Sequence, residues 1–264
     1  MNPYIITFDN PLIGGISIAL VIIISIVVQY FTNKLIDFEK NEAMHTVGGI
    51  YMSAVGTLYS VVLGMIIVNA SEDFSTVRQS IGNEVEALLK IYTGADELPK
   101  SYSDRLKTTI KIYVDGVIDD EWDLLSKGMT PENTRRLFKN IWFSIRGYEP
   151  KTENQKIIYQ AIVTSWTSAE EARRVRVTFD NYTITKIEWF IMIAGGLVNI
   201  AFTFFFSMRN SLAHALMTGM VAFMVSINLY AVFLLSDPFS GTKEVTLDQF
   251  LFLRTYISEG RDLH

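Results

Sequence analysis

Four stretches of the chain carry no charged residue, and each is long enough to cross a membrane as a helix. They cover residues 12–31, 47–70, 189–208 and 215–236, and the fourth helix is expected to begin at residue 211. A helix of about 20 apolar residues spans the ~30 Å hydrocarbon core of a bilayer. The pattern therefore predicts four transmembrane helices and excludes a soluble globular enzyme.

The segment between the second and third spans, residues 71–188, has the charge content of a soluble domain, with 17 basic and 19 acidic residues. Apolar residues recur there at steps of three and four, at Phe74, Val77, Ile81, Val85, Leu88 and Tyr92. This spacing is helical. We expect the second span to continue as one helix to about Tyr92, followed by helices over 101–126, 130–146 and 152–176.

These elements combine into an all-α integral membrane protein in which two transmembrane helical hairpins flank a helical soluble domain. The first hairpin covers residues 1–70, the soluble domain 71–188, the second hairpin 189–236 and a C-terminal tail 237–264. The tail is expected to open with an ordered turn at Asp237–Gly241 and to contain a short helix over 246–258.

The composition argues against enzyme chemistry. A net charge of −5 gives no reason to expect a nucleic-acid partner. The chain has no cysteine, which excludes disulfides and thiolate metal sites, and its three histidines are scattered. No nucleotide-binding loop, zinc-protease motif or serine-hydrolase motif is present. We therefore expect no catalytic residue, no metal and no cofactor.

Several short motifs occur in an order that resembles a known family. They are Asn83-Glu84, Leu88–Tyr92, Leu98-Pro99, Tyr113, Glu121-Trp122, Arg173, Arg176, Trp189 and Asp237–Gly241. Together they resemble the bacterial bestrophin-like membrane protein family, named for its similarity to bestrophin ion channels, over essentially the whole chain. One departure is Asp123, because many relatives carry proline directly after the acid and tryptophan pair.

The resemblance implies an oligomeric, pentameric ion channel with a pore along the symmetry axis. It also implies a multi-pass protein of the cell inner (plasma) membrane, with the soluble domain and both termini in the cytoplasm. The partners would then be the lipid bilayer, inorganic ions and other copies of the chain. A non-conducting membrane scaffold or sensor, whose helical domain binds a partner, is the alternative, since architecture does not fix function.

The second span carries the residues that such a pore would use. Small residues recur at steps of four, at Gly56, Ser60 and Gly64, and small faces let membrane helices pack closely. Given the resemblance, the bulky side chains of Leu58, Val62 and Ile66 would point at the axis as a hydrophobic constriction. The alternative is that all of these residues serve packing within the protein.

Polar residues at the end of the second span, Asn69, Glu72 and Asp73, would lie at the mouth of the pore. Acidic rings concentrate cations, so these residues favour cations over anions if the protein conducts. The alternative is that they cap the interface and face solvent.

Five acidic residues lie within residues 115–123. On a regular helix, Asp115, Asp119 and Asp123 share one face. We expect acids of this cluster to pair with the arginines of residues 173–176. A solvated face and a site for a hard cation are the alternatives.

Three polar residues belong to the later spans: Asn199, His214 and Asn228. Buried polar groups in a bilayer usually bridge helices. We expect that role here, with a part in conduction as the alternative.

Overall fold

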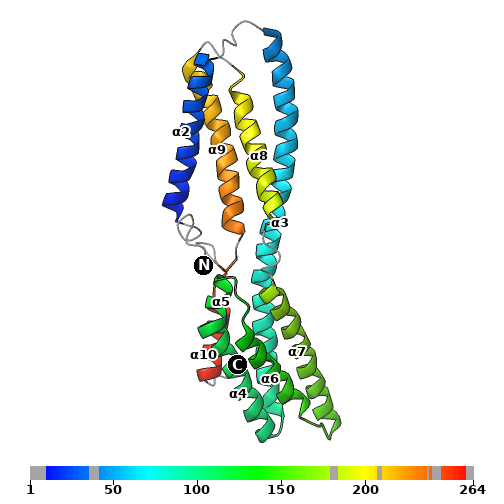
Figure 1. Cartoon of the computed structure of the whole chain (residues 1–264). Coiled ribbons are helices and arrows are strands. Elements are labelled where there is room, and N and C mark those ends of the chain that lie inside the picture. The colour runs from blue at the N-terminus through cyan, green and yellow to red at the C-terminus, as the bar shows by residue number, and fades with distance from the viewer. Residues whose placement is uncertain are drawn as a thin grey trace.

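The computed structural model describes residues 10–35, 42–178, 184–206, 210–236, 238–239 and 245–259. The described chain is helical throughout and contains no strand. It has an elongated shape, with a bundle of long apolar helices at one end and a compact set of shorter helices at the other (Figure 1). This confirms the predicted all-α class.

Four helices of the described chain are long and apolar enough to cross a membrane: α2 (Pro11–Leu35), α3 (Glu42–Gly94), α8 (Lys186–Thr203) and α9 (Ser211–Leu235). They include the four uncharged stretches of the sequence, although α8 ends before residue 208. Three of them begin with side-chain caps, and at α2 the Asn10 side chain accepts from the Leu12 amide at 3.0 Å. Thr185 and Glu188 form a reciprocal capping box at α8, and the Asn210 side chain accepts from the Leu212 and Ala213 amides at α9.

The packing of the first two spans differs from a simple hairpin. Helix α2 packs on α9, whereas α3 packs on α8 and α9. Figure 1 shows α8 and α9 lying between α2 and α3. In the described chain, the first and second spans therefore do not pair along their lengths, although they follow each other in the sequence.

The soluble domain consists of short helices that match the predicted ranges. They are η2 (Ala95–Glu97), α4 (Lys100–Gly116), the π-helical turn η3 (Val117–Glu121), α5 (Trp122–Ser126), α6 (Glu132–Arg146), α7 (Glu153–Thr178) and α10 (Asp248–Glu259). The turn after α5 places Gly128 at φ 65°, a conformation that favours glycine. The Met129 amide then donates to the Leu124 carbonyl and closes the end of α5.

Helix α3 belongs to both parts of the molecule. Its 53 residues correspond to a length of about 80 Å, and Figure 1 shows it running from the membrane bundle into the soluble domain. The predicted apolar stripe is its buried face, because Val77, Ile81 and Leu88 are almost wholly buried in the core of the domain. Helix α7 packs along this part of α3, and this is the most extensive helix pair of the domain.

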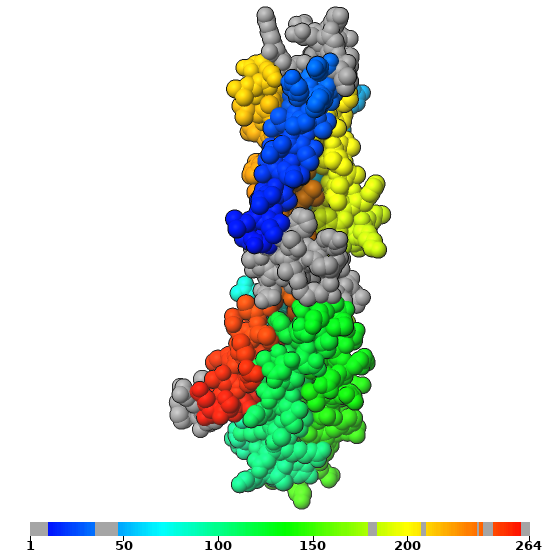
Figure 2. Space-filling model, turned by 60° about the vertical axis from the view of Figure 1, so that its left-hand side comes forward, coloured from blue at the N-terminus to red at the C-terminus, as the bar shows by residue number. Residues whose placement is uncertain are grey.

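The tail returns to the soluble domain. Figure 2 shows α10 against the surface formed by the helices of this domain, and α10 contacts α3 and α4. Of the predicted turn at Asp237–Gly241, Pro238 and Phe239 are described and the other three residues lie outside the described chain. The ring of Phe239 packs edge-on against Trp122 at 5.5 Å, and the Val245 amide donates to the Pro238 carbonyl at 2.7 Å.

The polar residues of the later spans behave differently from one another. His214 bridges helices as predicted, with Nε2 at 2.9 Å from the Thr203 carbonyl of α8 and Nδ1 at 3.0 Å from the Asn33 amide of α2. Because a carbonyl only accepts, Nε2 carries the proton and Nδ1 accepts from Asn33. The amides of Asn199 and Asn228 donate to carbonyls of their own helices, so a bridging role for these two residues stays a prediction.

Helices α2 and α9 approach each other closely at Gly14. A methyl group on Gly14 would lie 2.3 Å from the ring of Tyr230, whereas a methyl group on Gly15 would meet nothing within 4 Å. We expect Gly14→Ala to lower the free energy of unfolding by about 1–3 kcal/mol through overpacking. The neighbouring Gly15→Ala should be neutral or slightly stabilising, because alanine favours helix more than glycine does. Thermal melting of the purified protein in detergent measures both, and equal melting temperatures would contradict this packing.

Candidate functional site

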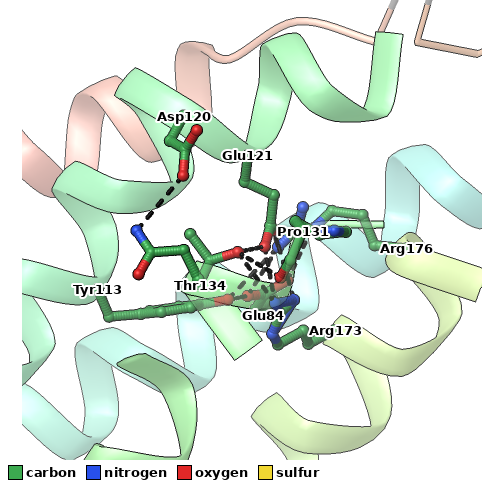
Figure 3. Close-up of polar contacts among 9 residues, drawn as sticks. Glu84, Tyr113, Asp120, Glu121, Pro131, Thr134, Arg173 and Arg176 are labelled. Atoms are coloured by element: carbon green, nitrogen blue, oxygen red, sulfur yellow. Dashed lines mark hydrogen bonds and ion pairs between the residues drawn. The ribbon is translucent and has the colours of Figure 1, made fainter. Parts of the chain in front are cut away.

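A buried cluster of charged and polar side chains lies at the centre of the soluble domain. Its six members come from five elements: Glu84 of α3, Tyr113 of α4, Glu121 of η3, Thr134 of α6, and Arg173 and Arg176 of α7. Figure 3 shows their polar ends converging on one point. All six are buried, which is unusual for four ionised groups. We refer to these six residues as the central cluster.

Arg176 holds two carboxylates at once. Its Nε donates to Oε2 of Glu84 at 2.8 Å and its Nη2 donates to Oε1 of Glu84 at 3.2 Å. The same Nη2 lies 2.6 Å from Oε1 of Glu121. The guanidinium therefore joins the helix that crosses the membrane to the π-helical turn of the domain.

Arg173 forms the second bridge. Its Nη2 donates to Oε2 of Glu121 at 2.7 Å and its Nη1 lies 3.4 Å from the other oxygen of the same carboxylate. The hydroxyl of Thr134 also donates to Glu121, and the hydroxyl of Tyr113 donates to Glu84. Two carboxylates thus face two guanidinium groups, and the formal charge of the cluster is zero.

Aromatic rings surround the two arginines. The guanidinium of Arg173 lies 5.6 Å from the ring centres of Tyr113 and Phe138, and that of Arg176 lies 5.3 Å from the ring centre of Phe250. These rings exclude water and offer their negative faces to the cations. Through Phe250, α10 joins the elements that the central cluster fixes.

The environment shifts three ionisation equilibria in the cluster. Burial raises the pKa of Tyr113 well above its usual value, so its hydroxyl remains a donor. Burial would also raise the pKa of Glu121, but Arg176 and Arg173 outweigh it and the pKa is lowered. Burial would lower the pKa of Arg176, but Glu121 and Glu84 outweigh it and the pKa is raised. The pairing therefore keeps the acid and the base ionised.

The acidic cluster of residues 115–123 pairs differently from the sequence prediction. Within the described part of the chain, Glu121 is the acid of this cluster that pairs with Arg173 and Arg176, whereas Asp119 pairs with Arg254 at 3.3 Å and Asp123 pairs with Lys127. The reason is the π-helical turn at Val117–Glu121, which breaks the regular helical period on which the shared face depended. The prediction of an arginine partner is confirmed for Glu121 and wrong for Asp119 and Asp123.

Sequence reasoning did not identify Glu84 and Thr134 as partners of the arginines. A signal for Glu84 existed, because it falls among the apolar positions Ile81, Val85 and Leu88 on the buried side of α3. An acidic side chain at a buried position of a helix needs a cationic partner. Nothing comparable marks Thr134.

The predicted pore residues of α3 do not share one environment in the single chain. Leu58 and Val62 are 69% and 41% exposed, whereas Ile66 is 8% exposed and packs with Met192 and Val232 of α8 and α9. Eight residues of an α-helix turn by about 80° beyond two full turns, which carries Ile66 away from Leu58. In the single chain, Ile66 therefore lies behind the face that Leu58 and Val62 present, and its place at a pore axis stays a prediction.

The predicted packing residues also differ in their surroundings. A methyl group on Gly56 would lie 3.3 Å from the Asn199 side chain of α8, so Gly56 faces the same chain. Ser60 is exposed, and a methyl group on Gly64 would meet nothing within 4 Å. Farther along α3, Asn69 is exposed and Asp73 is half-buried. The exposed part of this set is free in the single chain and available to a neighbour.

The central cluster has the composition of a structural clamp. Among the described residues, no three His, Cys, Asp or Glu side chains come together in an arrangement that could hold a metal ion. Each carboxylate of the cluster is saturated by an arginine and a hydroxyl, which leaves neither oxygen pair available as a general base. What the arrangement can do is fix α3, α6 and α7 relative to one another.

The central cluster predicts a specific dependence of stability on pH. The pKa of Glu121 is lower in the folded chain than its ordinary value of 4.5, so its stabilising effect is present above that value and is lost as the pH falls through the folded-state pKa. We expect Glu121→Gln to cost about 3–5 kcal/mol at pH 7, because the arginines then lack a counter-charge. The variant should also lose less stability than the parent chain between about pH 5 and pH 3.

Glu132→Gln is the matched control, because Glu132 is exposed and pairs with Arg135 on the surface of α6. That change should stay within about 0.5 kcal/mol. Melting temperatures of the three proteins across this pH range decide the matter. Parallel pH curves for the parent chain and Glu121→Gln would contradict the role given to Glu121.

Comparison with known proteins identifies structures of similar fold and a family. Two solved structures share the architecture: a point mutant of a bacterial bestrophin homolog from Klebsiella pneumoniae, with a TM-score of 0.69, and a membrane protein with a point substitution, with a TM-score of 0.68. Each is 10% identical to this chain, and each match covers 92% of this chain and 98% of the other. No curated protein matches the sequence. The model of the bestrophin-like domain matches residues 17–250, and the chain therefore belongs to the bestrophin-like family.

Proposed function

We propose that this chain is the subunit of an oligomeric, pentameric ion channel whose axial pore is lined by the exposed face of α3. One observation carries the proposal. In the membrane part of α3, α8 and α9 leave four positions uncovered: the bulky pair Leu58 and Val62, and, on a different side of the helix, the small pair Ser60 and Gly64. A helix with small residues on a free face is suited to pack against copies of itself around an axis.

The bulky residues of this face suit a hydrophobic constriction. Leu58 and Val62 are one turn apart and exposed. In a ring of subunits, they would form two apolar layers that repel water and so set a barrier to ions. Ile66 supports these layers from behind through its contacts with Met192 and Val232.

The charges at the inner end of the face favour cations. Glu72 is exposed and Asp73 is half-buried, close to the exposed Asn69. Repeated around an axis, these acids would give a negative ring, which raises the local concentration of inorganic cations and repels anions.

The central cluster supports a coupling between the soluble domain and the pore. Glu84 lies on the same uninterrupted helix as Val62, and Arg176 of α7 holds Glu84 by two bonds. A displacement of α7 would therefore move the part of α3 that leaves the membrane.

Conductance is the direct test of this proposal. We expect the purified chain in planar bilayers to pass current, and Leu58→Ala and Val62→Ala each to raise the single-channel conductance or the open probability, because a smaller side chain widens and wets the constriction. Ile66→Ala should instead lower the melting temperature, since a large-to-small change in a packed site typically costs about 2–5 kcal/mol.

Ile16→Ala on α2 is the control, because Ile16 is a 64% exposed apolar residue on another span. It should leave the current unchanged. Absence of current from a correctly folded oligomer would favour the alternative, a non-conducting scaffold or sensor. A conducting channel that ignores both alanine substitutions would have its pore elsewhere, and the mass of the oligomer in detergent measures the number of subunits.

We further propose that the protein lies in the cell inner (plasma) membrane, with the soluble domain in the cytoplasm. The parent chain has no cysteine, so single cysteines report sidedness cleanly. In intact cells, an impermeant maleimide should label Asn210→Cys, at the far end of the bundle, and should label Ser101→Cys and Ser258→Cys only after lysis. All three positions are exposed. Labelling of the two serine positions in intact cells would reverse the orientation.

A further inference from the structure

A large cavity opens beside the central cluster, between α6 and α7. It has a volume of about 1080 Å³ and is also lined by the loop at Gly128–Pro131 and by Pro238 and Phe239. This is just above the volumes typical of small-molecule sites, about 300–1000 Å³. Arg173, Arg176 and Pro131, which Figure 3 shows at the central cluster, belong to its lining.

Two buried hydrogen-bond donors in the lining of this cavity have no acceptor among the described residues. They are Nη1 of Arg176 and Nε1 of Trp166. The other nitrogens of Arg176 are bonded to Glu84 and Glu121, so Nη1 is the part of this guanidinium that the central cluster does not use. A buried donor without an acceptor is costly, and a charged one more so. Both donors are therefore open to an acceptor supplied by a ligand.

Aromatic rings form one wall of the cavity. Trp142 and Trp166 lie with their ring centres 4.4 Å apart, and Phe138 stacks on Trp166 at 6.0 Å. Phe143 and Phe239 add two further rings to the lining. Such walls accommodate a flat apolar body and gain from stacking with it.

The charged groups of the lining divide into a rim and an inner wall. At exposed positions the lining carries three basic residues, Arg135, Lys139 and Arg174, and two acidic residues, Glu170 and Glu171. The rim therefore has one basic residue in excess, which favours an anion. On the inner wall, Nη1 of Arg176 has no acceptor among the described residues and adds a charge-assisted donor.

We propose that this cavity binds a small organic anion with a flat apolar body, whose acceptor oxygens take the free donors of Arg176 and Trp166 while its body lies against the tryptophan wall. A carboxylate is the simplest group that fits, because it accepts from a guanidinium with a charge-assisted bond. The assignment rests on the cavity and its donors, and does not depend on whether the protein conducts.

The probe is 2-naphthoate, and its uncharged counterpart 2-naphthamide has nearly the same shape. Each is titrated into the full-length oligomer in phosphatidylcholine nanodiscs by isothermal titration calorimetry, with empty nanodiscs as the blank. We expect saturable binding of 2-naphthoate and at least tenfold weaker binding of 2-naphthamide, because the amide offers one neutral oxygen where the carboxylate offers two anionic oxygens to the donors of Arg176 and Trp166.

Two tryptophan variants test the donor. Trp166→Phe removes the unsatisfied Nε1 and should weaken 2-naphthoate binding about fivefold, the effect of about one hydrogen bond. Trp142→Phe makes the same change in the same wall, but the Nε1 of Trp142 is not a buried donor without a partner, so its affinity should stay within about twofold of the parent chain. Neither variant removes a member of the central cluster.

Two threonine variants test the location. Thr167 lines the cavity and Thr164 does not, and both are exposed residues of α7 whose hydroxyls donate to their own helix. Thr167→Trp should weaken binding at least tenfold by filling the cavity, and Thr164→Trp should leave it unchanged. If Thr167→Trp does not fold, the pair of tryptophan variants remains decisive.

The proposal is overturned if the parent chain shows no saturable binding of 2-naphthoate. It is equally overturned if 2-naphthoate and 2-naphthamide bind alike, or if neither Trp166→Phe nor a folded Thr167→Trp changes the affinity. Inorganic phosphate serves as a third ligand, and competition by phosphate as strong as that by 2-naphthoate would also overturn it, because the apolar body would then contribute nothing.

Discussion

The soluble domain depends on the burial of two carboxylates together with two guanidinium groups. A charge without a partner is too costly to bury, so Glu84, Glu121, Arg173 and Arg176 can be enclosed only when all four are in place. These four residues come from α3, η3 and α7. The apolar core alone would fix the relative positions of these elements less specifically. Bidentate bonds from a planar guanidinium fix direction as well as distance. The central cluster therefore determines how α7 lies along α3, and the other helices pack around that pair.

This constraint acts on the helix that crosses the membrane. Glu84 lies about 20 Å along the axis from Ala70, the end of the uncharged stretch, and the chain between them is helical without interruption. No proline occurs in α3, and the helix has no break between these two residues. Under the proposed function, an event that moves α7 would be transmitted through Glu84 to the membrane part of α3. The cavity lies beside Arg176, so an anion bound there would contact the residue that joins α7 to α3.

The sequence predicted the elements of this architecture better than their contacts. Uncharged runs and helical spacing depend on neighbouring residues alone, so the four spans and the extension of α3 to Gly94 were accessible. Pairing depends on the packing of distant segments. The regular period placed Asp119 and Asp123 on one face toward the arginines, and the π-helical turn at Val117–Glu121 directed Glu121 there instead. Nor does the sequence indicate that α2 packs on α9 rather than on α3, because apolar residues surround each span on every side.

An apolar helix face that is exposed in the single chain does not by itself require an oligomer, because lipid can cover it. Lipid tails are as apolar as leucine, so Leu58 gains little by leaving lipid for a protein neighbour. Small residues are different, because they allow two helices to approach until their backbones touch, and lipid chains fill such a groove poorly. Ser60 and Gly64, which face open space in the single chain, are therefore stronger grounds for self-association than the bulky residues beside them. In a ring built on that contact, the bulky residues are left to line the space that the ring encloses.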